Sequence, residues 1–158
     1  RRGGSFVAEL RGLMQALQNN IGRVVTPLCD ATLGDARCTV DLPALAVSGT
    51  VTSVTSRRVF TASALAGAVD TYAFGEVLWT SGACSGLRMD VKANASGGVI
   101  TLQLPAVYDI GVGNTFSIKP GCDKAAATCA AKFGNRVNFR GFAFVPGPDR
   151  QLLVGGQN

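Results

Sequence analysis

Four cysteines in two pairs constrain the fold of this chain more than any other feature of its sequence. Cys29 and Cys38 are separated by eight residues, and Cys122 and Cys129 by six. About eighty residues of strand-like sequence lie between the pairs. Both pairs have basic neighbours, so the sequence predicts that the two ends of one domain meet at a common centre. The basic residues closest in sequence to the pairs are Arg37, Lys124, Lys132, Arg136 and Arg140.

Three kinds of centre are compatible with these cysteines. Disulfides are disfavoured because the chain has five cysteines, an odd number, and no signal-like segment. Structural zinc sites favour cysteines two to four residues apart, which the spacings of eight and six do not match. An iron–sulfur cluster tolerates wider spacing, and its four thiolates leave a net charge of about −2 that nearby cations can offset. Spacing alone leaves zinc and a cluster equally open.

The fifth cysteine, Cys84, stands apart from both pairs. It lies in the segment SGACSG, at a predicted turn between strands. A lone thiol in such a place is expected to be a small buried side chain.

The region between the pairs has the pattern of β structure. Leu87, Met89 and Val91 alternate with charged residues, a turn follows at 94–98, and alternation resumes over 99–104, which predicts a hairpin. Further strands are predicted at 45–54, 59–60, 74–80 and 115–119, with helical turns at 63–68 and 124–133. We therefore expect a mainly β fold: a small barrel or sandwich of six to seven short strands, with one or two short helices and a cysteine-ligated cluster lobe.

Three segments are predicted along the chain. Residues 1–26 contain a short strand (5–10) and an amphipathic helix around Leu13 and Leu17; residues 27–145 form the β domain with the cluster site, and residues 146–158 a C-terminal tail. Phenylalanines near the C-terminus are expected to pack on the body of the domain: Phe139, Phe142 and Phe144. The chain begins at Arg1 without an initiator methionine, so we expect a processed piece or a fragment that continues from an N-terminal half.

Composition limits the possible functions. The chain has no histidine, which excludes Ser-His-Asp and Cys-His nucleophiles and histidine-ligated zinc. Its net charge of +5 is not arranged as a basic stripe with interleaved aromatics, so nucleic-acid readout is not expected. No run of 18 apolar residues occurs, so no membrane span is expected. With only 16% charged residues, the surface fits a component that packs against partners in a larger assembly.

Four segments together resemble a known family over nearly the whole chain. They are SFVAELRGL, CDATLGDARC, LWTSGACSGLRMDVK and GCDKAAATCAAKFGNRVNFRGF. In order and spacing they resemble the C-terminal half of the tail hub proteins of gene transfer agents and related long-tailed phages. These are similar to the iron–sulfur minor tail protein of lambda-like phages.

The resemblance implies a structural, non-enzymatic role in the tail tip of a virion assembled in the bacterial host cytoplasm. It implies that the chain joins the tail tube to the distal tip as a trimer, in contact with distal tail and tail-tip proteins. It also implies an iron–sulfur cluster of the [4Fe–4S] type. Its ligands by this resemblance are Cys29, Cys38, Cys122 and Cys129.

Other functions remain open from the sequence. The chain could be an iron–sulfur electron-transfer protein, although the cluster ligands of ferredoxins lie close together in sequence and the cysteines of this chain are scattered. A zinc-stabilised binding domain is another. A hydrolase with a serine or cysteine nucleophile is disfavoured by the missing histidine.

Overall fold

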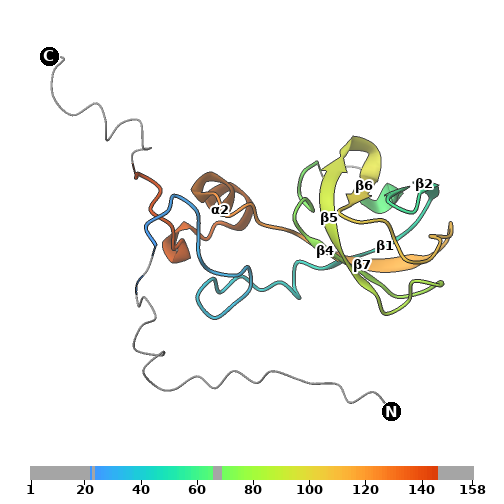
Figure 1. Cartoon of the computed structure of the whole chain (residues 1–158), viewed down its shortest axis with the longest axis horizontal. Helices are drawn as coiled ribbons and strands as arrows, with labels where there is room; N and C mark the ends of the chain where they lie inside the picture. Colours follow the sequence, from blue (N-terminus) through green and yellow to red (C-terminus); the bar gives the residue numbers. More distant parts are fainter. Residues whose placement is uncertain (1–21, 23, 66–68, 146–158) are drawn as a thin grey trace, which may run out of the picture.

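The computed structural model describes residues 22, 24–65 and 69–145 of the chain. These residues form a half-barrel of strands and, beside it, a smaller lobe that contains the one α-helix of the described part (Figure 1). The strands are β1 (Val47–Thr50), β2 (Ser53–Ser56), β3 (Val59–Thr61), β4 (Glu76–Trp79), β5 (Arg88–Ala95), β6 (Val99–Leu102) and β7 (Thr115–Lys119). The helix is α2 (Ala126–Phe133), and short 3-10 turns occupy Ser63–Leu65, Ser96–Gly98 and Arg136–Asn138.

The seven strands form one antiparallel sheet in the order β1-β7-β4-β5-β6-β3-β2. Its two end strands, β1 and β2, are consecutive in the chain and are separated only by Val51 and Thr52. The Val51 amide donates to the Asn114 carbonyl at 2.9 Å, whereas the Thr52 amide donates to the Thr61 carbonyl at 2.8 Å. The chain therefore crosses from one end of the sheet to the other at this point, and the sheet curls back on itself.

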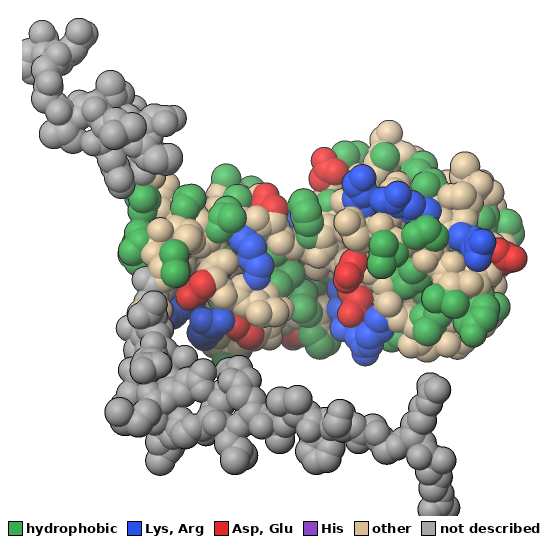
Figure 2. Space-filling view, viewed as in Figure 1, with side chains coloured by type: hydrophobic (Ala, Val, Ile, Leu, Met, Phe, Trp, Pro, Cys, Tyr) green, Lys and Arg blue, Asp and Glu red, His purple; other side chains and the backbone are tan. Residues whose placement is uncertain are grey.

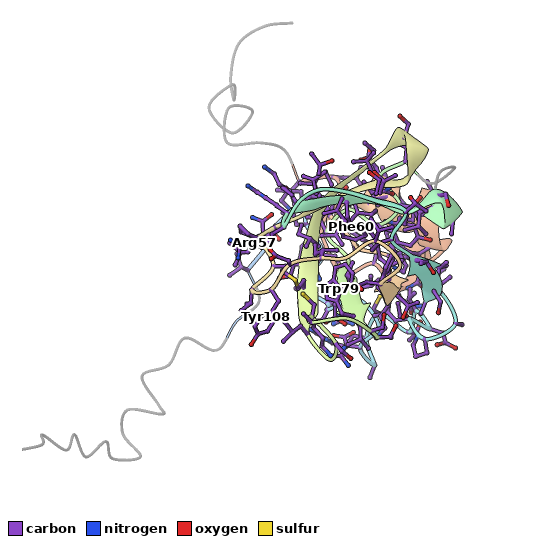
Figure 3. All side chains as sticks on the ribbon, turned by 90° about the vertical axis from the view of Figure 1, so that its right-hand side faces the viewer. Arg57, Phe60, Trp79 and Tyr108 are labelled. Atoms are coloured by element: carbon purple, nitrogen blue, oxygen red, sulfur yellow. The ribbon has the colours of Figure 1, made fainter. Side chains whose placement is uncertain are left out.

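The core of the half-barrel is built around three aromatic rings. The centroid of Phe60 lies 5.2 Å from that of Trp79 and 5.3 Å from that of Phe116, and Trp79 and Phe116 are 5.7 Å apart. All three side chains are at most 1% exposed, and Figure 3 shows Phe60 and Trp79 inside the curl of the sheet. Alternation places the neighbouring apolar side chains on the same inner face, as the predicted hairpin requires. They include Val77, Val91, Ile100, Leu102 and Ile118.

The cysteine lobe consists of residues 24–46 and 120–145, which flank the half-barrel in sequence. β1 and β7 are paired side by side, with Val47 opposite Ile118. Because the first lobe segment leads into β1 and the second leaves β7, this ladder brings the two segments together. At Gly121 the backbone packs so closely on residues 73–75 that an added Cβ would lie 2.0 Å from a backbone carbon of Phe74.

The predicted mainly β fold is confirmed, with seven strands curled into a half-barrel. The hairpin at 87–104 and the helix within 124–133 are also confirmed. The predicted strand at 5–10, the helix around Leu13 and Leu17, and the tail at 146–158 lie outside the described residues, so the segment boundaries stay a prediction.

One expectation about the C-terminal phenylalanines is wrong. Phe144 is 88% exposed and does not pack on the body of the domain, and Phe142 is 40% exposed. The half-barrel already fills its core with side chains of its own strands. The Phe142 amide donates to the Thr26 carbonyl at 2.8 Å, so the C-terminal segment is held against the cysteine lobe. Only Phe139 turns inward, toward the cysteines.

Candidate metal centre

The structure brings all four paired cysteines to one pocket in the cysteine lobe. Cys29, Cys38, Cys122 and Cys129 all line it, and all are free thiols. Cys38 and Cys129 are buried and the other two are half-buried. The rest of the wall is mostly apolar, with three polar side chains. The apolar residues are Ala31, Leu33, Val40, Phe133 and Phe139, and the polar residues are Lys124, Asn135 and Asn138.

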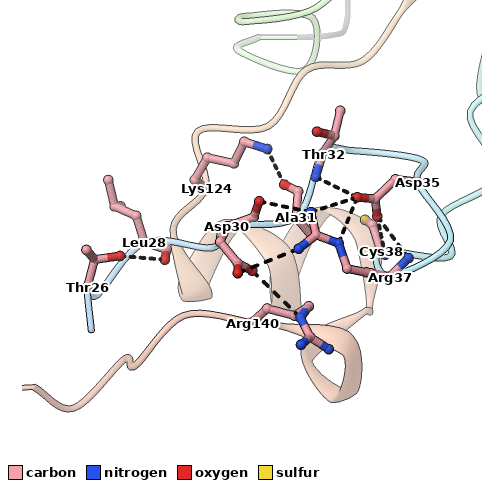
Figure 4. Close-up of polar contacts among 10 residues, drawn as sticks. All are labelled: Thr26, Leu28, Asp30, Ala31, Thr32, Asp35, Arg37, Cys38, Lys124 and Arg140. Atoms are coloured by element: carbon pink, nitrogen blue, oxygen red, sulfur yellow. Dashed lines mark hydrogen bonds and ion pairs between the residues drawn. The ribbon is translucent and has the colours of Figure 1, made fainter. Parts of the chain in front are cut away.

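Asp35 fixes the loop that carries Cys38. Its carboxylate accepts hydrogen bonds from the backbone amides of Thr32 (3.0 Å), Arg37 (3.0 Å) and Cys38 (2.7 Å), and also from the Arg37 guanidinium (Figure 4). Desolvation by itself raises the pKa of Asp35, but the hydrogen bonds from Cys38, Thr32 and Arg37 outweigh it and hold the pKa below its ordinary value. The ionised carboxylate therefore sets the position of the Cys38 backbone.

The second cysteine segment is shaped by α2. Cys129 lies on this helix, which ends at Gly134 in the left-handed conformation (φ 59°). Asp123 accepts hydrogen bonds from the Ala125 amide (2.9 Å) and the Thr128 hydroxyl (2.7 Å) near the first turn. Cys122 lies between the end of β7 and this helix, so it faces the same pocket from a separate element.

Asn135 links the two cysteine segments. Its side-chain amide donates to the Cys38 carbonyl and lies 3.8 Å from the Cys38 sulfur. Its backbone carbonyl accepts the Cys129 thiol at 3.3 Å, and its side-chain oxygen accepts a hydrogen bond from Asn138 at 2.7 Å. One residue thus contacts a cysteine of each pair.

The pKa of the Cys129 thiol is raised above its ordinary value by its surroundings. Burial raises this pKa, the neighbouring Cys122, Cys38 and Cys29 raise it further, and Arg136 lowers it. Each of the other three cysteines therefore acts electrostatically on Cys129. In the metal-free chain Cys129 stays a thiol at neutral pH, and ligation requires that its proton be released.

Two of the five basic residues near the cysteines are held by a carboxylate. Arg37 and Arg140 contact Asp30 at 3.6 and 3.7 Å, and Figure 4 shows both guanidinium groups turned toward it. Arg37 also pairs with Asp35 at 3.2 Å. Their charge is largely compensated by these carboxylates.

The other three basic residues differ in what they face. Lys132 donates to the Gly121 carbonyl at 2.6 Å, and burial lowers its pKa against the opposing effect of Cys122. The Arg136 guanidinium lies 5.8 Å from the centre of the Phe144 ring. Of the five basic residues near the cysteines, only Lys124 is in the wall of the pocket.

The donor set of the pocket fits a thiolate-ligated centre. Four thiols face one apolar pocket, and no carboxylate is in its wall. The free space between them is small, about 10 Å³, which is close to the volume that one water molecule needs. Within the described ranges, no three cysteine or acidic side chains are already arranged to hold a single metal ion. The cysteine side chains must therefore turn to surround any centre, and a cluster requires the pocket to widen.

Cys84 lies outside this site, as expected. It is fully buried among the core residues of the half-barrel, and its thiol donates to the Tyr108 carbonyl at 3.5 Å. The roles of Asp35 and Asn135 were not predicted. The only sequence signal for Asp35 is its position three residues before Cys38, a spacing common in turns that a side-chain carboxylate closes.

Comparison with known proteins shows which protein family the chain belongs to. A model of the family described as phage conserved hypothetical protein BR0599 matches residues 70–149, about half of the chain. The chain belongs to this family. A second model, described as the N-terminal attachment domain of a baseplate hub protein, matches residues 1–41. No curated protein sequence matches the chain.

A solved structure resembles this family member over most of its length. It is a chain in the virion of a native gene transfer agent particle, with 35% sequence identity and a TM-score of 0.71. The match covers 94% of this chain and 54% of the other, so this chain spans about half the length of that relative. These matches confirm the predicted resemblance to phage and gene transfer agent tail hub proteins, and the predicted location in a virion tail. No helix within the described ranges is long and apolar enough to cross a membrane.

Proposed function

We propose that this hub protein is a structural component of the tail tip that joins the tail tube to the distal tip, and that an iron–sulfur cluster in the cysteine lobe stabilises it. The observation that carries the proposal is the meeting of four cysteines, from both ends of the domain, at one pocket. The ligand set is Cys29, Cys38, Cys122 and Cys129, within a proposed unit of residues 27–145.

A centre at this place has a clear mechanical effect. It joins the segment before β1 to the segment after β7, and the loop between Cys38 and Cys129 contains about ninety residues. Closing a loop of this length restricts the unfolded chain by about 4–5 kcal/mol in the cross-link model. The β1–β7 ladder alone opens from its end under load, whereas a ligated centre beyond that end opposes such peeling.

The exposed apolar side chains support a role within an assembly. Figure 2 shows apolar side chains on the surfaces of both lobes. Exposed apolar side chains of the half-barrel include three in the loop between β6 and β7, Leu104, Val107 and Val112, which are 68–69% exposed. Large exposed apolar side chains grouped in this way are typical of surfaces that contact other proteins. We propose that the contacts are with neighbouring copies in a trimer and with distal tail and tip proteins.

Zinc remains the alternative centre, and the small volume of the pocket favours it. One ion needs less space than a cluster, although the thiols must approach one another to ligate it at about 2.3 Å. In either case the centre is structural and the proposed role in the tail is the same.

Metal analysis of anaerobically purified protein distinguishes the two centres. We expect iron and acid-labile sulfide in equal amounts, about four of each per chain for a [4Fe–4S] cluster, with broad absorption in the blue. About one zinc per chain without sulfide would show that the centre is zinc and not a cluster. Protein that contains neither iron nor zinc would refute the proposed centre.

The fifth cysteine provides a matched control. Cys122→Ala should lose the metal, whereas Cys84→Ala, which removes a thiol buried in the half-barrel, should keep it. Particles that carry Cys122→Ala should show incomplete or unstable tips by electron microscopy. Complete tips and full infectivity in metal-free Cys122→Ala particles would show that the centre has no role in assembly.

A further inference from the structure

The backbone of Lys124 has a conformation that lysine rarely adopts. Its φ is 67°, in the left-handed region, where side chains with a Cβ are strained and glycine is favoured. A glycine at this position would follow the turn more easily. The presence of lysine therefore points to a function for its side chain at this place.

Lys124 contacts both cysteine segments. Its carbonyl accepts the Cys29 amide at 2.9 Å, and its own amide lies 3.4 Å from the Cys122 sulfur. Its ammonium group donates to the carbonyl of Ala31, a buried residue two positions after Cys29 (Figure 4). The backbone and side chain of Lys124 thus fasten the first segment to the second.

The charge of Lys124 has no carboxylate partner in the described part of the chain. The ion pairs found there involve Arg37, Arg57, Arg88 and Arg140. The side chain is half-buried in the pocket wall beside the four thiols. Thiolates in an apolar pocket require a nearby positive charge, because burial strongly disfavours uncompensated anions.

We propose that Lys124 is a positioning residue of the four-cysteine site, which holds the two cysteine segments together and supplies a positive charge in the pocket wall beside the thiolate-ligated centre. This inference rests on the proposed cluster. The charge stabilises the reduced, more negative form of the cluster, so its removal lowers the reduction potential.

The test compares reduction potentials of the reconstituted full chain. Lys124→Met keeps the length of the side chain and removes the charge, and Lys124→Arg restores a charge. Lys92→Met is the control, because Lys92 is an exposed lysine on β5 in the half-barrel. We expect Lys124→Met to shift the ratio of oxidised to reduced cluster about tenfold at a fixed potential, equal to about 59 mV for a one-electron couple. Lys124→Arg and Lys92→Met should shift it less than threefold.

The outcomes separate this inference from the proposed cluster. Wild-type protein without iron and sulfide would overturn both. A loaded wild type with an unchanged potential in Lys124→Met would overturn only the role of Lys124. If Lys124→Met does not load, loading of Lys124→Arg supports the charge requirement, and failure of both variants overturns it.

A glycine variant separates charge from folding. Lys124→Gly suits the left-handed backbone, so the cluster-free variant should fold. Its loaded form should show the same lowered potential as Lys124→Met. A wild-type potential in loaded Lys124→Gly would show that the side chain does not act on the centre.

Discussion

Gly49 in β1 is a position where strand propensity and tertiary packing predict opposite effects of one substitution. It is buried and lies opposite Phe116 of β7. Strand propensity alone predicts that Gly49→Ala stabilises the chain by about 0.5–1 kcal/mol, since glycine loses more backbone entropy on folding. The structure predicts destabilisation.

The magnitude follows from the space around Gly49. A Cβ at this position would lie 2.8 Å from the Cζ atom of Phe116, with two further ring atoms at 3.2 and 3.3 Å. The ring has little freedom to move, because it is 1% exposed and packs edge-on against Phe60 and Trp79. Overpacking of a core costs about 1–3 kcal/mol. Since the higher strand propensity of alanine offsets about 0.5–1 kcal/mol of this cost, Gly49→Ala should lower the free energy of unfolding by about 1–2 kcal/mol.

Urea denaturation followed by tryptophan fluorescence measures this change. Trp79 is the only tryptophan in the chain and lies 5.7 Å from the Phe116 ring, so its emission reports directly on this core. The matched control is a double-mutant cycle with Phe116→Leu, which removes the ring atoms that the new methyl group meets. The double variant should be about 1 kcal/mol more stable than the sum of the single effects predicts. A neutral or stabilising Gly49→Ala, or an additive cycle, would refute the reasoning.

Two further predictions concern the core and the Cys38 loop. Phe60→Ala should lower the free energy of unfolding by about 3–5 kcal/mol, because Phe60 is fully buried. Phe144→Ala, at an 88% exposed position, should change it by less than about 0.5 kcal/mol. Similar effects of the two substitutions would contradict the assigned core. The folded pKa of Asp35 lies below its ordinary value of 3.8, so its contribution to stability is present above that pH and is lost as the pH falls through the folded pKa. The Cys38 amide donates to both the side chain and the backbone carbonyl of Asp35. Its hydrogen-exchange protection should therefore persist down to about pH 4 and be reduced at neutral pH in Asp35→Asn, which keeps only the backbone acceptor unchanged. Equal protection in both proteins at neutral pH would argue against this role.

The β fold was largely predictable because its signals are local. Alternation over 87–104 has a period of two residues, which is the period of a strand with one buried face, and the turn at 94–98 fixes the pairing. The closure of the sheet was not predictable. It depends on the bend at Val51 and Thr52, where one extended segment changes partners: Thr52 bonds to the nearby Thr61, whereas Val51 bonds to Asn114, which is distant in sequence.

The candidate site was predicted in part. The cysteines stood out because two pairs with basic neighbours are unusual in a chain with little charge, and the family resemblance indicated the same four residues. The contributions of Asp35 and Asn135 were not visible, since each acts through hydrogen bonds to backbone atoms that only the folded loop presents. Phe144 was wrongly expected to pack on the body of the domain, because hydrophobicity shows that a side chain can be buried but not whether a surface remains to cover it.

The sequence by itself determined the strands, the helix that carries Cys129 and the set of thiols, because periodicity and residue type are local properties. The tertiary structure decided which groups meet. The β1–β7 ladder brings the segments that carry Cys38 and Cys122 to one pocket. The backbone of Lys124 is in the left-handed region, its amide lies near the Cys122 sulfur, and its ammonium reaches the Ala31 carbonyl. The contact between Lys124 and Ala31 joins residues 93 positions apart, and no pattern within a short stretch of sequence encodes a distance between such residues.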